Sequence, residues 1–281
     1  MFKSAVFKRF MRRKFSVIGA IILIIFFCAA IFGPMLCSQD PLAPDPTAIH
    51  QGPTAAHWFG TDYLGRDTFT RIIYGARVSL SISLIGVLCG SAMGIILGVC
   101  AGYFGGWVDS VISRALDILL AFPGLLLAIM IVAIMGKGLV NTAIAIAVMS
   151  VPSVARMVRG VVLTLRSSEY ISACRVMGAS NLWILATHII PNSVSQIIVN
   201  ITLSLGTSIL TASSLSFLGL GVKHPLATWG TMINFAYKRG AFLRQAYAYL
   251  LSPGVCIMLL SLSFYLISLY FEHRQAAIQE K

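Results

Sequence analysis

The sequence predicts an all-α polytopic membrane protein with six transmembrane helices. Of the 281 residues, 58% are hydrophobic and 11% are charged, whereas a soluble globular domain averages roughly 45–50% apolar and about 25% charged residues. The mean hydropathy is +0.87. Apolar runs long enough to cross a hydrocarbon layer about 30 Å thick recur along the chain. These observations exclude a purely soluble protein and make a lipid bilayer an expected partner.

Six apolar runs with few charges define the predicted spans. They cover residues 15–36, 78–102, 111–135, 139–155, 193–220 and 247–271. The first run follows basic residues, but its apolar core is longer than the roughly 7–15 residues of a cleaved signal peptide, so we expect a retained helix. In the third run, Pro123 removes a backbone hydrogen bond and predicts a kink that acts as a hinge. The fourth run is the shortest and contains Pro152.

The distribution of basic residues predicts the orientation of these spans. The chain carries 21 Lys and Arg against 9 Asp and Glu, a formal charge of +12, which in a soluble protein would suggest nucleic acid. Six of these cations lie in the tail at residues 1–14, and such clusters stay on the cytoplasmic side. Six crossings then place the loop at 156–191 and the tail at 272–281 on the same side. The charge therefore reports membrane topology, and we expect no nucleic-acid partner.

The six cysteines do not predict a disulfide framework. Five of them lie in apolar runs or beside them, whereas structural disulfides are typical of small secreted domains. Cys37 is the one cysteine at the start of the loop at 37–77, on the extracytoplasmic side of the predicted topology.

Glycines recur every fourth residue along the second predicted span. They are Gly86, Gly90, Gly94, Gly98 and Gly102. On a helix this spacing forms one slowly rotating stripe, along which a second backbone can approach closely. We expect tight packing inside the bundle; a moving or pore-lining face is the alternative.

Two charges lie near the start of the third predicted span. Arg114 and Asp117 are three residues apart and so share a helix face, where charges inside a bilayer are usually paired. We favour a structural pair near the cytoplasmic headgroups over a contact with a transported substrate.

The segment at 167–180 predicts a short cytoplasmic helix. Ser167 or Ser168 can cap its start, and Ile171, Cys174 and Met177 recur at a spacing of three, which predicts one apolar face. Gly178 ends the helix. Such a helix is too short to be stable alone. It either lies on lipid as an interfacial helix or docks against a soluble partner.

The same loop resembles a known signature. SACRVMGASNLWILATHIIP is similar to E-A-A-x3-G-x9-I-x-L-P of ATP-binding-cassette importer permeases, with Ala173, Gly178 and Pro191 matching and Ser172, Cys174 and His188 departing from it. Pro191 is expected to stop the segment that leads back to the membrane.

Four further segments resemble the second, C-type permease of the dipeptide/oligopeptide/nickel importer family. They are HWFGTDYLGRDTFTRIIYGARVSL, GGWVDSVISRALDILLAFP, SLSFLGLGVKHPLATWGTMI and SPG. The resemblance runs from about residue 13 to 265 and departs at the C-terminal tail, which lacks the acidic ending common in the family.

The resemblance implies a type I importer-like permease bundle with a cytoplasmic coupling helix. Such a chain forms half of a path for di- or oligopeptides, in a bacterial cell (inner) membrane. Its partners are a homologous second permease, two cytoplasmic ATPases and an extracytoplasmic substrate-binding protein. No cofactor or metal is expected on this chain, because ATP and Mg²⁺ bind the ATPases. A nickel or metal-chelate cargo is the alternative within the family.

The resemblance also assigns expected roles to residues. The coupling residues are Glu169, Ser172, Ala173, Cys174, Gly178 and Pro191; the pathway or gating candidates are Asp62, Arg66, Asp67, Arg114, Asp117 and Pro123. For the first three of the second group, we favour local charge pairs and a helix cap over substrate contact. The outer loop at 221–246, with Trp229 and four cations, is either a seat for the binding protein or a solvated loop.

An enzyme is not indicated. The chain has no G-x-x-x-x-G-K-[ST], H-E-x-x-H or G-x-S-x-G, and its five histidines are scattered. A self-sufficient secondary transporter is a remote alternative. Such proteins usually contain internal repeats and buried acids, whereas this sequence has no evident repeat and Asp117 is its one acid well inside a predicted span.

Overall fold

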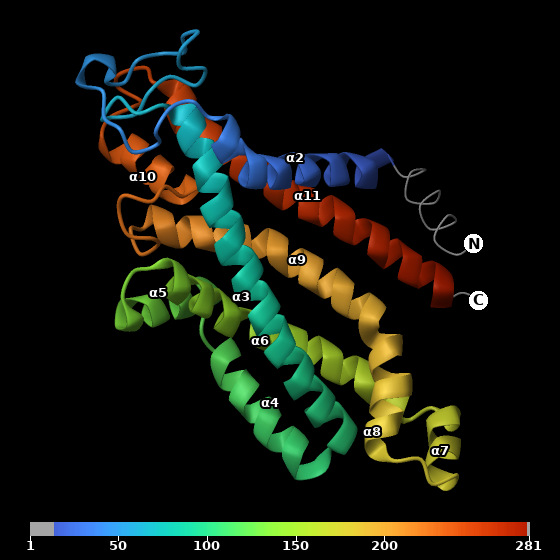
Figure 1. The fold of residues 1–281 in the computed structure, drawn as a ribbon. Helices are drawn as coiled ribbons and strands as arrows, with labels where there is room; N and C mark the ends of the chain where they lie inside the picture. Colours follow the sequence, from blue (N-terminus) through green and yellow to red (C-terminus); the bar gives the residue numbers. More distant parts are fainter. Residues whose placement is uncertain (1–13, 280–281) are drawn as a thin grey trace.

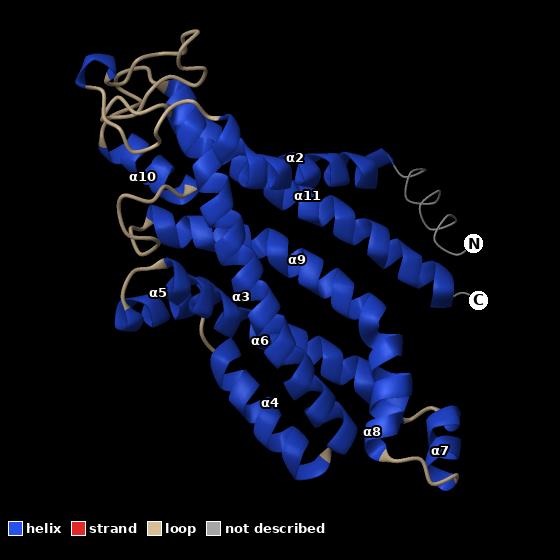
Figure 2. Cartoon of the chain, in the orientation of Figure 1, coloured by secondary structure: helices blue, strands red, loops and turns tan. Residues whose placement is uncertain are grey.

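The computed structural model describes residues 14–279, so the predicted basic tail at 1–14 lies outside the described residues except for Lys14. Within this range the regular structure is helical, with one isolated β-bridge between Thr61 and Asp67 (Figure 2). Five helices are long and apolar enough to cross a membrane, and a bent helix pair raises the number to six. The predicted all-α membrane fold is therefore confirmed.

The helices follow the chain in a simple order. The long ones are α2 (Lys14–Leu36), α3 (Thr68–Phe104), α6 (Leu139–Arg166), α9 (Ile190–Phe217) and α11 (Tyr247–Gln279). The shorter ones are η1 (Pro46–Ala48), α4 (Gly106–Leu120), α5 (Gly124–Met135), α7 (Glu169–Val176), α8 (Asn181–Ile184), the π-helical η2 (Leu185–Ile189) and α10 (Trp229–Lys238). The loop at 37–67 and α10 gather at one end of the bundle, and α7 lies at the other (Figure 1).

The glycine stripe of α3 packs against α6, as the sequence predicts. A Cβ atom at Gly94 would lie 2.8 Å from Cβ of Val154, and one at Gly102 would lie 2.8 Å from Cβ of Val162. Gly86, Gly90 and Gly98 meet α6 in the same way. The missing side chains let the two backbones approach closely, which supplies van der Waals contact where lipid offers no hydrophobic drive for association.

The third predicted span is a broken pair rather than one kinked helix. α4 and α5 meet at a bend of 88°. Ala121 is the C-cap of α4 and Pro123 is the N-cap of α5. The expected hinge is thus a break, because Pro123 is followed by a helix that starts anew.

Two predicted boundaries lie within continuous helix instead. α6 contains Pro152 and continues to Arg166, so the loop predicted to begin at residue 156 begins only after Arg166. Pro191 does not stop its segment, since helix runs unbroken from Asn181 to Phe217. Just before Pro191, the backbone N–H of Ile190 donates to the carbonyl of Leu185 in a π-turn. Local π adjustment is one of the ways in which membrane helices accommodate proline.

α10 and the outer ends of the long helices share one apolar core. Trp229 is fully buried, its indole N–H donates to the carbonyl of Ile72 at 3.0 Å, and its ring lies 5.5 Å from that of Phe26. The loop at 221–246 is therefore largely folded onto the bundle. Trp229, named above as part of a docking seat, stabilises the fold and is not available to a partner.

Candidate functional site

The short helix α7 is held by one face and exposes the other. Ile171 is fully buried and Cys174 is 9% exposed, in a cluster with Val158 and Val162 of α6. Ser172 and Ala173 are exposed. Because α7 packs onto the end of α6, its outer face is a fixed surface of small side chains that another protein can approach closely.

The tip of α7 differs from the prediction. Met177 was expected on the buried face, but it follows the last helical residue and is 77% exposed; its neighbour Val176 is 89% exposed. The helix ends because Gly178 adopts φ +81° while Ala179 N–H donates to the carbonyl of Cys174 at 3.0 Å. An exposed apolar tip is a second feature suited to a protein partner.

A thiol–imidazole contact joins α7 to the base of α9. Sγ of Cys174 lies 3.9 Å from Nε2 of His188, in the π-helical turn. The ring of His188 also meets Trp183 and Tyr170, with centroids 5.0 and 5.9 Å apart. The contact therefore joins α7 to the helix that continues as α9.

The structural charge pair predicted between Arg114 and Asp117 is wrong in its partner. Asp117 Oδ1 accepts from Arg156 of α6 at 2.8 Å, with both side chains exposed, rather than from Arg114. A second and less exposed pair on the same two helices is bidentate: Arg159 donates to both oxygens of Asp109 at 2.5 and 2.6 Å. These pairs tie α4 to α6. The second pair is not evident from the sequence because its members are 50 residues apart.

At the end of the bundle opposite α7 (Figure 1), the expected local charge pairs and helix cap are present. Asp62 is fully buried; Arg66 donates to its Oδ2 at 2.7 Å, and Arg71 Nε lies 3.4 Å from the same oxygen. Asp67 caps α3 by accepting from the backbone N–H of Thr70 at 2.7 Å. These contacts stabilise the start of α3 and support the structural interpretation.

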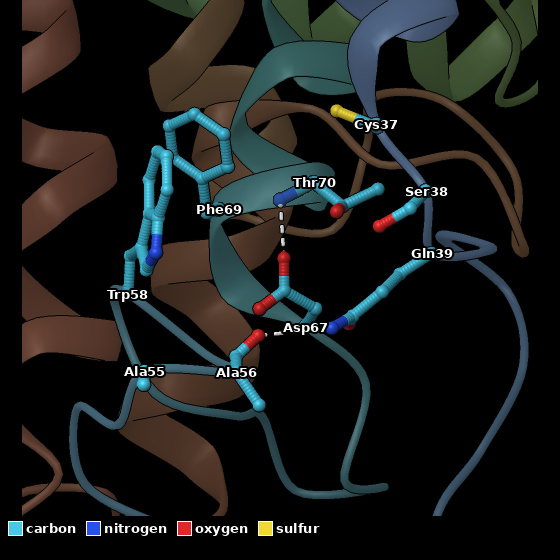
Figure 3. Close-up of a pocket in the computed structure, with 9 residues that line it drawn as sticks. All are labelled: Cys37, Ser38, Gln39, Ala55, Ala56, Trp58, Asp67, Phe69 and Thr70. Carbon is cyan, nitrogen blue, oxygen red and sulfur yellow. Dashed lines mark hydrogen bonds between the residues drawn. The ribbon is translucent and has the colours of Figure 1, made fainter.

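Next to this cap lies a pocket of about 320 Å³. It is lined by Cys37, Ser38, Gln39, Ala55, Ala56, Trp58, Asp67, Phe69 and Thr70 (Figure 3). Burial and the nearby carboxylate of Asp67 raise the pKa of the Cys37 thiol, although a hydrogen bond with Thr70 opposes the shift. The thiol is therefore mostly protonated at neutral pH.

A polar cavity of about 130 Å³ lies deeper in the bundle, between α6 and α9. Its wall includes the hydroxyl side chains of Ser150, Ser153, Ser204, Thr207, Ser208 and Thr211. Several of these hydroxyls donate to carbonyls of their own helix, such as Thr211 to Thr207 at 3.1 Å and Ser150 to Ile146 at 2.9 Å. The cavity wall is therefore rich in hydroxyl oxygens that can still accept hydrogen bonds.

The predicted site residues thus divide into three places. Glu169, Ser172 and Ala173 share the exposed part of α7, Cys174 lies beneath it, Gly178 ends it, and Pro191 lies at the start of α9. The second place is the start of α3 and the loop before it, which hold Asp62, Arg66 and Asp67. The third is α4 and the break after it, which hold Arg114, Asp117 and Pro123. In the part of the chain that the structure describes, no group of three or more His, Cys, Asp or Glu side chains could hold a metal ion.

Comparison with known proteins decides the family. Residues 94–277 match the model of the "binding-protein-dependent transport system inner membrane component", and residues 2–53 match the "N-terminal TM domain of oligopeptide transport permease C". The chain belongs to this importer permease family. Together the two matches confirm the C-type permease branch of ATP-binding-cassette importers, which the loop signature and the four further segments predicted.

Among curated relatives, this permease is 46% identical over 261 residues to the dipeptide transport system permease protein DppC of Alkalihalophilus pseudofirmus, covering 93% of this chain and 85% of the relative. It is 45% identical over 230 residues to the glutathione transport system permease protein GsiD of Pectobacterium atrosepticum, covering 82% and 76% respectively. Among solved structures, an inward-facing form of the MetNI methionine ABC transporter matches 75% of this permease and 97% of the solved chain, with a TM-score of 0.60 and 18% identity. That likeness confirms the type I importer-like bundle.

Proposed function

We propose that this chain forms half of a translocation path for di- or oligopeptides and couples it to ATP hydrolysis through α7. A homologous second permease supplies the other half, two cytoplasmic ATPases bind ATP and Mg²⁺, and an extracytoplasmic binding protein delivers cargo. The chain itself performs no catalysis. It lies in a bacterial cell (inner) membrane with both termini and α7 on the cytoplasmic side, which the six cations of residues 1–14 support.

The observation that carries the coupling role is the two-sided packing of α7. Its buried face is continuous with the cluster that contains Val158 and Val162 of α6, and its Cys174 contacts His188 below α9. A force applied to the exposed Ser172 and Ala173 by a closing ATPase dimer therefore reaches both helices that line the polar cavity. Rigid packing transmits such displacements because cores are close-packed and have low compressibility.

The hydroxyl-lined cavity supports a peptide cargo. Because hydroxyls such as that of Thr211 donate to their own helix backbone, what they offer to cargo is oxygen lone pairs. Peptide N–H groups are complementary donors, whatever the side chains of the peptide. The identity with the dipeptide permease over 93% of this chain supports the same cargo class.

Reconstitution of the complete importer tests this function. Vesicles that contain both permeases, the ATPases and the binding protein are expected to accumulate labelled dipeptide when ATP is supplied on the ATPase side. A nickel chelate is offered in parallel as the competing cargo. Accumulation of the chelate without the dipeptide would contradict a peptide cargo and indicate a metal-chelate importer. Uptake by this chain alone, driven by a proton or sodium gradient, would indicate a secondary transporter instead.

A further inference from the structure

The pocket lined in part by Asp67 and Thr70 has no role in the proposed coupling through α7. Its walls come entirely from residues 37–70, whereas the polar cavity is made by residues 146–211, so the two share no residue. The pocket is formed by the loop at 37–67 and the first turn of α3. This loop extends beyond the ends of α2 and α3 (Figure 1). Its side chains combine one carboxylate with an aromatic wall (Figure 3).

The carboxylate of Asp67 is almost buried, with 5% of the side chain exposed. One oxygen accepts from Thr70 N–H at 2.7 Å and the other contacts Nδ1 of His57 at 3.0 Å. A carboxylate offers about four acceptor positions, so roughly half remain. The nearby Arg66 and Arg71 both pair with Asp62, and the described salt-bridge partner of Asp67 is a histidine, which is charged only when protonated. The pocket therefore holds a negative charge without a fixed counter-charge.

The aromatic wall favours the same ligand chemistry. The rings of Trp58 and Phe69 lie 5.0 Å apart at 52°, and aromatic faces attract ammonium and guanidinium groups. Gln39 donates its Nε2 to the carbonyl of Ala56 at 2.9 Å, which leaves its amide oxygen as an acceptor. An organic cation with several N–H donors fits this combination of charge, π-face and acceptors.

We propose that the pocket binds a basic side chain, an Arg guanidinium or a Lys ammonium, presented by the extracytoplasmic binding protein when it docks. Trp58 is 65% exposed in a loop outside the helical bundle, and exposed Trp beside a pocket is typical of the anchor residues of protein interfaces. This proposal rests on the proposed function, since it assumes that a binding protein delivers cargo.

The first test measures cation binding directly. Ethylguanidinium is titrated into the complete importer, without binding protein, in lipid nanodiscs with 5-fluorotryptophan incorporated; Trp58→Phe assigns the ¹⁹F signal. A saturable shift of the Trp58 signal is expected, with affinity at least tenfold weaker in Asp67→Asn. Asparagine also caps helices well, so that variant removes charge while keeping the α3 cap. Asp40→Asn, an equal charge change at an exposed position of the same loop, is the matched control and is expected to bind like wild type.

The second test measures docking. Binding protein is passed over immobilised importer, and Asp67→Asn is expected to weaken its affinity about tenfold, with ethylguanidinium competing and Asp40→Asn without effect. Equal docking by wild type and Asp67→Asn overturns the proposal. The proposal is also overturned if Asp67→Asn changes the KM of uptake only for peptides with a free amino terminus, because the bound cation would then belong to the cargo. A Trp58 signal that does not respond in the importer also overturns it. ATP-driven uptake by the wild-type importer checks the proposed function separately.

Discussion

Sγ of Cys174 lies 3.9 Å from Nε2 of His188, and both residues occupy positions where the loop departs from the importer signature. The signature has Ala and Ile at these two positions. In this chain a larger side chain on α7 thus meets a polar ring in the π-helical turn of residues 185–189. The two departures contact each other, and we expect them to compensate as a pair.

We expect the substitutions Cys174→Ala and His188→Ile to be non-additive. Each alone removes one side of a packed contact, so each lowers stability and coupled transport; the double variant restores the Ala–Ile pair of the signature and recovers most of both. Contacting residues typically show coupling energies of about 0.5–3 kcal/mol. A double-mutant cycle on thermal unfolding of the importer measures this energy. Additive effects would show that the contact does not couple the helices.

Gly178 is required for its backbone conformation rather than for space. Its φ is +81°, and nothing lies within 4 Å of the position where a Cβ would be. Asparagine tolerates this region, whereas β-branched residues do not. We expect Gly178→Asn to keep most peptide uptake and Gly178→Val to lose most of it while still inserting in the membrane. Peptide uptake and cargo-stimulated ATPase activity are measured together, with Gly178→Trp as a bulkier variant. If cargo still stimulates ATP hydrolysis in Gly178→Trp, the turn at Gly178 has no role in coupling.

The glycine stripe predicts a position-dependent cost of side-chain size. A Cβ at Gly94 would lie 2.8 Å from Cβ of Val154 and 2.9 Å from the carbonyl of Val151, so Gly94→Leu forces α3 and α6 apart. Overpacking of this kind costs typically about 1–3 kcal/mol. Gly160→Leu is the matched control, because nothing lies within 4 Å of a Cβ there. Thermal unfolding in detergent should show a lower Tm for Gly94→Leu only; equal Tm values would contradict close packing.

His50 makes the loop at 37–67 sensitive to acid. Burial, and to a smaller degree the Arg244 cation, lower the pKa of His50, while Asp62 opposes them; its buried Nδ1 has no hydrogen-bond partner. The folded loop therefore favours the neutral ring. The contribution of neutral His50 to stability is fully present above its pKa in the unfolded chain, about 6.5. This contribution is lost as the pH falls towards the lower pKa that His50 has in the folded protein.

Acidification from pH 7.5 to 5.5 should therefore loosen the loop at 37–67 in wild type and not in His50→Asn, since Asn also tolerates the φ of 52° found here. The ratio of proteolysis rates of the two proteins in this loop measures the effect and cancels the pH dependence of the protease. A constant ratio would contradict the burial of a neutral His50.

Most features set by neighbouring residues were predictable from the sequence, with Pro191 and Met177 as exceptions, whereas the partners of individual charged side chains, which distant contacts set, were not. The apolar runs indicated where the membrane helices lie. The sequence also predicted that Asp67 caps a helix, and it caps α3. Pro191 misled because the π-turn of residues 185–189 absorbs it. Asp117 pairs with Arg156, 39 residues away, and no local spacing indicates such a partner. Met177 keeps the spacing of the buried face, but it lies past the last helical turn.

Coupling through α7 is tested most directly by comparing peptide uptake with ATP hydrolysis in vesicles of the complete importer that carry Ala173→Trp. Ala173 is exposed on α7, where a bulky side chain blocks close approach of an ATPase. Thr164→Trp, at an exposed position near the end of α6, is the matched control. We expect Ala173→Trp to insert normally but to lose ATP-driven uptake and the stimulation of hydrolysis by cargo, while the control keeps both. Full uptake and full stimulation in Ala173→Trp would contradict the assignment of α7 as the coupling helix.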